Sequence, residues 1–287
     1  MPVIADTAYP RLPVDPGPAG LDAFTPETAE LVFVRRRTRH PGPRLALLVL
    51  LKTFQRLGYF VRFADVPAAI TGHVAASVSL DAAAHEISGY DGTTYRVRLS
   101  ALVRGFVGVA GYDRAARSLA VRACIEAART RDDLADIVNA GIEGLLRHRC
   151  ELPAFGTLLK LARTARALVN RAYHRRIAAA LTSEVRERLA VLLVVPDGAP
   201  RFPWDQVKAE PSRPSPQRMR EHLAHLAWLR GQAVADEVST GVPNRKLRHF
   251  HRRGTVAQCC RPVPCDPVQT HGHHGRPAAP PSGAWIG

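Results

Sequence analysis

The sequence has few cysteines and no long apolar run, and both shortages limit the class of protein. Five cysteines occur among 287 residues, two isolated and three near the C-terminus, which is not a secreted disulfide framework. The best apolar run, Leu45–Leu51, is interrupted by Lys52 and falls short of the roughly 20 apolar residues of a membrane span. The N-terminus also lacks the basic and apolar regions of a signal peptide. We therefore expect a cytoplasmic protein without a membrane partner.

Catalytic motifs are missing as well. The chain has no phosphate-binding loop and no Gly-x-Ser-x-Gly nucleophile motif. Gly105, Gly108 and Gly111 miss the spacing of a dinucleotide-binding loop. The C-terminal residues that could bind zinc lack the paired spacing of a zinc site: Cys259, Cys260, Cys265, His271, His273 and His274. The sequence therefore predicts no catalytic residue, no metal and no cofactor, and a chain that is not itself an enzyme.

One acidic motif keeps an enzymatic alternative open. Asp132, Asp133 and Asp136 match the Asp-Asp-x-x-Asp pattern that holds magnesium and a diphosphate in helical prenyl-converting enzymes. Such a site needs a second acidic cluster on a facing helix, and the sequence offers none. The simpler interpretation places these acids in the first turn of a helix, where they interact favourably with the helix dipole. A diphosphate-binding enzyme therefore ranks last among the alternatives.

Acidic residues are absent from two long segments, although the chain as a whole carries 25 of them. Leu31–Ala64 contains only basic charges: Arg35, Arg36, Arg37, Arg39, Arg44, Lys52, Arg56 and Arg62. Leu152–Ser183 repeats the pattern with Lys160, Arg163, Arg166, Arg171, Arg175 and Arg176. The net charge is +15 and the pI about 10.6. A segment with one apolar face and only positive charge on the other suits a polyanion, and nucleic acid is the common one.

The hydrophobic periodicity predicts an all-α, multi-helical fold, and no convincing alternation of a β-strand occurs. Thr25-Pro26-Glu27 predicts a helix start, with the helix ending at the Pro-Gly-Pro break at 41–43. A second helix is expected to carry Leu45, Leu48 and Leu51 on one stripe and to end at Gly58. Further helices are predicted to begin near Val66, Thr94, Asp113, Asp132, Ser183 or Thr182, and Ser215, and a long helix is predicted after a break at Leu152-Pro153.

Composition shifts divide the chain into five predicted parts. We expect an extended arm over 1–22, a helix-turn-helix-like DNA-binding domain over 23–195 and a Pro-rich linker over 196–214. Residues 215–250 are expected to begin a second, incomplete helical domain. Residues 251–287 lack an apolar period and are expected to be disordered.

An ordered series of short motifs resembles the start of the Tn-three family transposases. It includes Phe24–Leu31, Arg35–His40, Arg44–Phe54, Leu57–Phe60, Val66-Pro67, Tyr90, Thr94, Arg96–Arg98 and Phe106–Gly108. The likeness is greatest at Glu151–Leu158 and Lys208–Ser215, and Val242–Phe250 also fits. Together the motifs cover about residues 20–250.

The resemblance implies a DNA-binding region that recognises the terminal inverted repeats of a transposon. The family's catalytic carboxylates lie beyond the length of this chain, so the resemblance implies a truncated or frameshifted transposase. One alternative is a protein–protein module or inhibitor that pairs with full-length transposase or with another copy of itself.

The arginines most strongly expected to contact DNA surround the Pro-Gly-Pro break, because a loop between helices exposes both side chains and backbone N–H groups to phosphates. They are Arg35, Arg36, Arg37, Arg39 and Arg44. A helix that could enter a groove contributes Arg96, Arg98 and Arg104, and the long helix contributes Arg171, Arg175 and Arg176.

Overall fold

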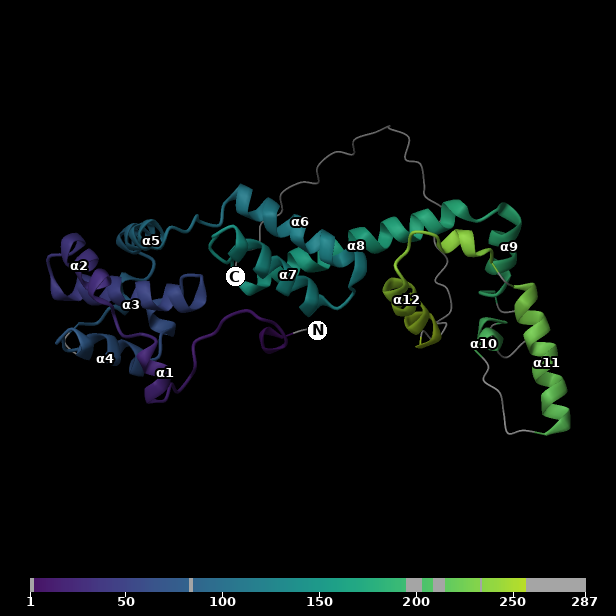
Figure 1. Ribbon diagram of the computed structural model, residues 1–287, viewed down its shortest axis with the longest axis horizontal. Helices are drawn as coiled ribbons and strands as arrows, with labels where there is room; N and C mark the ends of the chain where they lie inside the picture. The colour runs from purple at the N-terminus through teal and green to yellow at the C-terminus, as the bar shows by residue number, and fades with distance from the viewer. Residues whose placement is uncertain (1–2, 83–84, 195–202, 209–214, 233, 257–287) are drawn as a thin grey trace, which may run out of the picture. The chain divides into compact units, whose positions relative to one another are not determined.

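The fold is all-α, which confirms the prediction. The computed structural model describes residues 3–82, 85–194, 203–208, 215–232 and 234–256. Within these ranges it contains twelve α-helices, four short 3-10 helices and no β-strand (Figure 1). No helix in the same ranges is both long enough and apolar enough to cross a membrane.

The described residues fall into two compact units. The first lies within Met1–Val185 and Val234–Arg252, and the second within Arg186–Ala233 and Arg253–Gly287. The five domain boundaries expected from the sequence stay predictions. Residues 257–287, most of the predicted linker, and the Cys and His residues weighed as zinc ligands lie outside the described residues.

One hydrophobic cluster of the first unit is built around α3 (Pro41–Leu57). This helix has Pro41 in its first turn, and Gly58 ends it at φ +73°, a conformation that glycine adopts without strain. Every residue from Leu45 to Phe54 is buried, and a helix that is apolar all round belongs in a protein interior. The prediction of one packed face and one charged face is therefore wrong for α3. Three helices pack against it: α2 (Thr28–Arg37), α4 (Ala68–Ser77) and α5 (Thr94–Val107).

The start of α3 also corrects the expected break. The Pro-Gly-Pro sequence forms the first turn of α3 and is not a loop, because prolines are well accommodated where the backbone N–H has no intrahelical partner. The preceding helix begins at Thr28 after Glu27, not at Thr25. The backbone N–H of Glu27 donates to the Glu30 carboxylate at 2.7 Å, which caps the helix from within its own first turn.

A second hydrophobic cluster joins three helices that run side by side (Figure 1). They are α6 (Arg114–Thr130), α7 (Leu134–Arg147) and the first half of α8 (Phe155–Ala180). Asp113 caps α6 as predicted, because its carboxylate accepts the N–H of Ala116 at 2.8 Å. The cap of α7 is Asp133 and not Asp132, whose carboxylate is buried among distant partners.

The N-terminal residues pack onto this second cluster. Tyr9 is buried, stacks on Tyr59 at a ring-centroid distance of 5.0 Å, and donates its hydroxyl to the Pro153 carbonyl at 3.0 Å. Two short helices lie in the same N-terminal segment: a 3-10 helix at Ile4–Asp6 and α1 (Pro18–Asp22).

Of the four remaining α-helices among the described residues, α10 and α11 lie in the second unit, and the residues of α9 and α12 are divided between the two units. Ser215 caps α11 as predicted, since its hydroxyl accepts the N–H of Arg218 at 3.2 Å. α12 extends to Val256, so residues 251–256 are helical. The bounds are α9 (Ser183–Val191), α10 (Pro203–Val207), α11 (Pro216–Gly231) and α12 (Asn244–Val256).

Candidate nucleic-acid interface

The eleven arginines expected to contact DNA differ sharply in their exposure. Eight of them are exposed, and Arg44, Arg96 and Arg104 are only partly exposed. The exposed ones are Arg35, Arg36, Arg37, Arg39, Arg98, Arg171, Arg175 and Arg176. The fold thus separates a single predicted group into side chains that face solvent and side chains that take part in packing.

The end of α2 carries the densest exposed group. Arg35, Arg36 and Arg37 form its last turn, where cations interact favourably with the helix dipole, and Arg39 follows in the connection to α3. The buried Thr38 donates its hydroxyl to the Val34 carbonyl at 2.8 Å and fixes the point at which the helix ends. Four guanidinium groups are therefore held at one end of a short, well-anchored helix.

Arg96 and Arg104 have partners within the protein. The Nε atom of Arg96 is 3.1 Å from Asp91 Oδ1, and its guanidinium lies 5.3 Å from the Phe63 ring centroid. The Nε atom of Arg104 donates to Glu151 at 2.8 Å, with its guanidinium 5.2 Å from the Phe60 ring centroid. Both arginines tie α5 to other segments of the first unit. Their predicted role at DNA stays a prediction, and Arg98 is the exposed arginine between them.

The C-terminal half of α8 carries the third group. Arg171, Arg175 and Arg176 are exposed there, although Arg176 lies against the glycine at 241. A Cβ atom at Gly241, which has φ +77°, would come within 2.6 Å of both terminal nitrogens of Arg176. A side chain at position 241 would therefore clash with the Arg176 guanidinium.

The acid-free segments of the sequence are not acid-free in space. Lys52 is 7% exposed, and its Nζ atom lies 3.2 Å from Glu30, which precedes the first acid-free segment by one residue. Gln55 also donates to Glu30, at 2.6 Å. Lys52 therefore contributes a buried ion pair and not a surface charge. The sequence pattern could not distinguish the two roles, because the acid that neutralises Lys52 comes from another helix.

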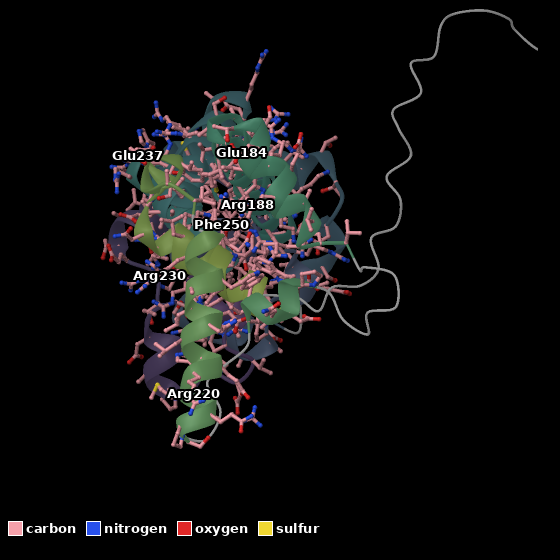
Figure 2. The ribbon with its side chains drawn as sticks, turned by 90° about the vertical axis from the view of Figure 1, so that its right-hand side faces the viewer. Glu184, Arg188, Arg220, Arg230, Glu237 and Phe250 are labelled. Carbon is pink, nitrogen blue, oxygen red and sulfur yellow. The ribbon has the colours of Figure 1, made fainter. Side chains whose placement is uncertain are left out.

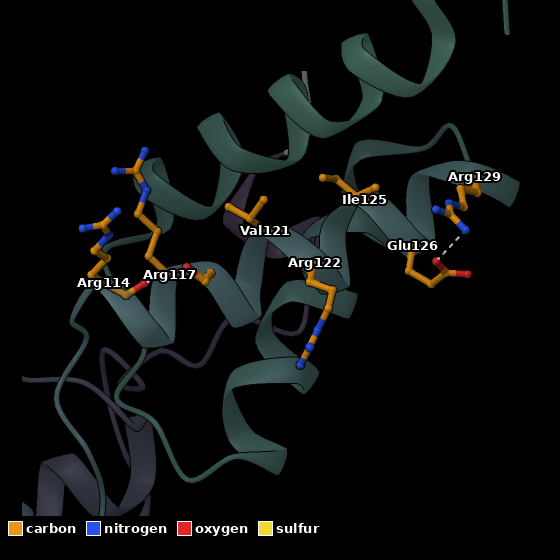
Figure 3. Close-up of a pocket in the computed structure, with 8 residues that line it drawn as sticks. Arg114, Arg117, Val121, Arg122, Ile125, Glu126 and Arg129 are labelled. Carbon is orange, nitrogen blue, oxygen red and sulfur yellow. Dashed lines mark hydrogen bonds and ion pairs between the residues drawn. The ribbon is translucent and has the colours of Figure 1, made fainter. Parts of the chain in front are cut away.

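A basic surface on α6 was not among the predicted residues. Arg114, Arg117 and Arg122 are exposed and, with Val121 and Ile125, line a shallow hollow along this helix (Figure 3). Figure 3 shows Arg114 and Arg117 projecting from the N-terminal end, with the two apolar side chains pointing to the same side. The sequence signal was available: every fourth residue from Ala116 to Ala128 is small and buried, which leaves the arginines on the remaining faces.

The acidic motif does not form a diphosphate site of the expected kind. Asp133 caps α7, and Asp136 lies 3.4 Å from Arg245. The carboxylate of Asp132 accepts from Lys246 at 2.8 Å and from Asn170 at 2.9 Å. Among the described residues, no group of three or more His, Cys, Asp or Glu side chains is arranged to hold a metal ion. Asp133 therefore caps a helix, and Asp132 and Asp136 pair with basic side chains of the same chain.

The pKa of Asp132 reflects this environment. Burial raises it, but the hydrogen bonds from Lys246 and Asn170 and the charges of Lys246 and His249 outweigh burial, so the pKa lies below its usual range. The carboxylate is consequently ionised at neutral pH. By contrast, burial raises the pKa of the Cys124 thiol to about 11, so this free cysteine stays protonated at neutral pH.

Comparison with known proteins gives one family match. Residues 4–165 match the model of a family described as Domain of unknown function (DUF4158), and the chain belongs to that family. The matched segment includes the α2, α5 and α6 arginines and ends within α8. A search of the curated proteins found no match.

Proposed function

We propose, on the premise that the chain belongs to the DUF4158 family, that it binds double-stranded DNA. In this proposal it recognises transposon terminal inverted repeats as the N-terminal part of a Tn-three-like transposase, and it neither cuts nor joins DNA by itself. The resemblance of its motifs to those transposases supplies the choice of DNA site. The surface charge supports the choice of DNA over other ligands.

The observation that carries the proposal is the set of eight exposed arginines from the predicted group. None of them takes part in an ion pair with another described residue, whereas Arg96 and Arg104 do. Exposed guanidinium groups without acidic partners keep their full charge for phosphate oxygens, and their planar fork can bind one phosphate through two N–H groups. The end of α2, with Arg35, Arg36 and Arg37 in one turn, is the strongest candidate contact.

Binding is tested by fluorescence anisotropy with a labelled duplex that carries the element's own end. We expect this duplex to bind more tightly than a scrambled duplex of equal length, and the affinity to fall steeply with salt. Replacing Arg35, Arg36 and Arg37 with Ala should weaken binding and flatten the log–log salt slope by up to about 0.9 per lost phosphate contact.

A matched control removes the same charge elsewhere. Arg129, Arg147 and Arg218 are exposed, but each is paired with a glutamate on its own helix. Changing these three to Ala should alter the salt slope much less. An equal loss in both variants would argue for general charge attraction, and the absence of any binding to the element's end would refute the proposal.

The absence of catalysis is tested separately. Supercoiled DNA that contains both element ends, incubated with the chain and magnesium or manganese, should stay uncut. Nicking that persists through removal of contaminating nucleases would contradict this part of the proposal without affecting DNA binding.

A second candidate, pairing with full-length transposase, is favoured by one observation. Met219 and Leu223 on α11 are 55% and 58% exposed, and Leu226 lies on the same face at 36%. Such a stripe on one helix face suits a helical partner. Co-purification with full-length transposase without DNA, lost on Leu223→Lys, would favour this function.

A further inference from the structure

The helix α12 is attached to the first unit through a fully buried lysine. Lys246 is 0% exposed, and its ammonium donates to the Asp132 carboxylate at 2.8 Å and to the Asn170 side-chain oxygen at 2.9 Å. A lysine is rarely buried to this degree unless it is paired, because an unpaired charge in the interior is very costly. Asp132 lies 114 positions away in the sequence, so this contact joins two distant segments.

The neighbours of Lys246 fix the rotation of α12 about its axis. His249 Nε2 lies 2.8 Å from the second oxygen of Asp132, and the Phe250 ring lies 5.0 Å from that of His174 on α8. Residues 246, 249 and 250 are spaced to share one helix face, and that face is turned toward α8 and Asp132. One acid thus holds two basic residues of α12 in place.

With that face buried, a second stripe of α12 is turned outward. Arg245, Arg248 and Arg252 recur at helical spacing and are all exposed, and Arg245 also lies 3.4 Å from Asp136. These three arginines line an open hollow together with Asn244 and His251. α12 itself contains no acidic residue, but Arg245 and Arg252 also line a second hollow, whose other residues include Asp6, Asp132, Asp133 and Asp136.

The spacing of the stripe suits a nucleic-acid backbone. At about 1.5 Å of rise per residue, Arg245 and Arg252 are roughly 10 Å apart along the helix axis. A DNA strand advances about 3.4 Å along its axis per phosphate, so the stripe spans about three phosphates. The described residues that line the hollow include the His251 ring but no Phe, Tyr or Trp, and this lack of a large stacking platform favours a duplex over a single strand.

We propose that α12 is a DNA-backbone contact of this protein, and that the buried Lys246–Asp132 pair holds it in the orientation that presents Arg245, Arg248 and Arg252. This inference rests on the proposed DNA binding and extends it beyond residue 165, where the family match ends. The lysine and the arginines of one short helix thereby have opposite tasks. Lys246 anchors the helix, and the arginines bind phosphate.

The first experiment removes the stripe. Arg245, Arg248 and Arg252 are changed together to Ala in the full chain, and anisotropy with the element-end duplex is measured over a range of salt. We expect at least about a tenfold loss of affinity and a salt slope flatter by up to about 2, because the charge of Arg245 is partly neutralised by Asp136.

The matched control removes three arginines from α11 of the second unit. Arg218, Arg220 and Arg230 are exposed, and Figure 2 shows Arg220 and Arg230 near opposite ends of that helix. Changing these three to Ala should shift affinity much less than the α12 variant. Equal losses would overturn the inference, because they would show that only net charge matters.

The second experiment releases the helix but keeps all three arginines. Lys246→Met leaves Asp132 as a buried acid without its main partner, so α12 should detach and trypsin should cleave at its arginines faster. Because the buried Lys246 itself contacts no phosphate, any flattening of the salt slope should come from the arginines that the released α12 no longer presents. Adding Asp132→Leu replaces the pair with apolar side chains and should restore both protection and binding.

Each remaining outcome has a defined meaning. If the unchanged chain does not bind the duplex, both the proposed function and this inference fail. If it binds and the α12 variant binds equally well, only this inference fails. The inference also fails if the α12 variant loses binding only to single-stranded DNA or to anionic vesicles. It fails as well if Lys246→Met frees the helix without affecting duplex binding.

Discussion

The two hydrophobic clusters of the first unit differ in the side chains through which their helices meet, although both contain large apolar residues. The cluster around α3 is filled by large residues: Leu45, Leu47, Leu48, Leu50, Leu51 and Phe54 are all at most 2% exposed. The cluster of α6, α7 and α8 brings helices close through small residues: Ala116, Ala120, Cys124, Ala128, Gly141 and Gly144. Both bury apolar area, and in the second the small residues of α6 and α7 also allow the two helices to approach closely.

The difference means that the two clusters should respond to opposite substitutions. Removing volume should damage the first cluster, where a large side chain leaves a cavity. Adding volume should damage the second, where Gly141 and Gly144 leave no room for a Cβ atom.

The largest expected effect is a loss of volume in the first cluster. Leu48→Ala removes a side chain that is 0% exposed and should lower the free energy of unfolding by about 3–5 kcal/mol. Leu146→Ala on α7 is the matched control, because Leu146 is 53% exposed and its loss should cost much less. Urea unfolding followed by circular dichroism measures both. Similar losses would contradict the view that α3 forms the centre of its cluster.

A smaller effect is expected from added volume in the second cluster. A Cβ atom at Gly141 would lie 2.9 Å from the Cys124 sulfur and 3.7 Å from Leu158, so Gly141→Ala should cost about 1–3 kcal/mol despite its better helix propensity. At Gly72 on α4 no atom lies within 4 Å, so Gly72→Ala should leave stability unchanged or raise it by up to about 1 kcal/mol. The same unfolding measurement tests both, and a stabilising Gly141→Ala would show that α6 and α7 can separate without cost.

The smallest effect concerns the polar contacts beside the second cluster. Because the pKa of Asp132 is lower in the folded protein, its ionisation stabilises the fold above the unfolded-state pKa of about 3.9. That contribution is lost as the pH falls through the lower, folded-state pKa. The difference in unfolding free energy between the unchanged chain and Asp132→Asn should therefore be constant from about pH 7 to pH 5 and shrink below about pH 4. A difference that grows on acidification would have the wrong sign.

Several helix limits could be predicted from the sequence because they depend on neighbouring residues. Asp113 and Ser215 cap the helices that follow them, and Gly58 ends α3, each through contacts within a few residues. The cap predicted at Asp132 is wrong, because Asp133 caps α7 instead. Asp132 and Asp133 are equally suitable by type, and the choice depended on Lys246, which lies far along the chain.

The candidate site could be predicted only in part, for a related reason. Exposure of Arg35, Arg36 and Arg37 follows from their position at the end of a short helix. The intramolecular partners of Arg96 and Arg104 come from other segments, and a pattern of charge along the sequence does not contain them. The α6 and α12 arginines lie outside the two acid-free segments: α6 also carries Glu126, and most of α12 falls in the predicted incomplete domain.

The sequence by itself determined the all-α class and most helix positions, because helix hydrogen bonds and caps form between residues at most a few positions apart. Tertiary structure alone decided which basic residues keep their charge for a ligand. Lys52 and Lys246 look like any other basic residue in the sequence, yet each is buried against an acid from another helix. Burial of a charge is permitted only where packing supplies its partner, and that partner is chosen by the folded arrangement.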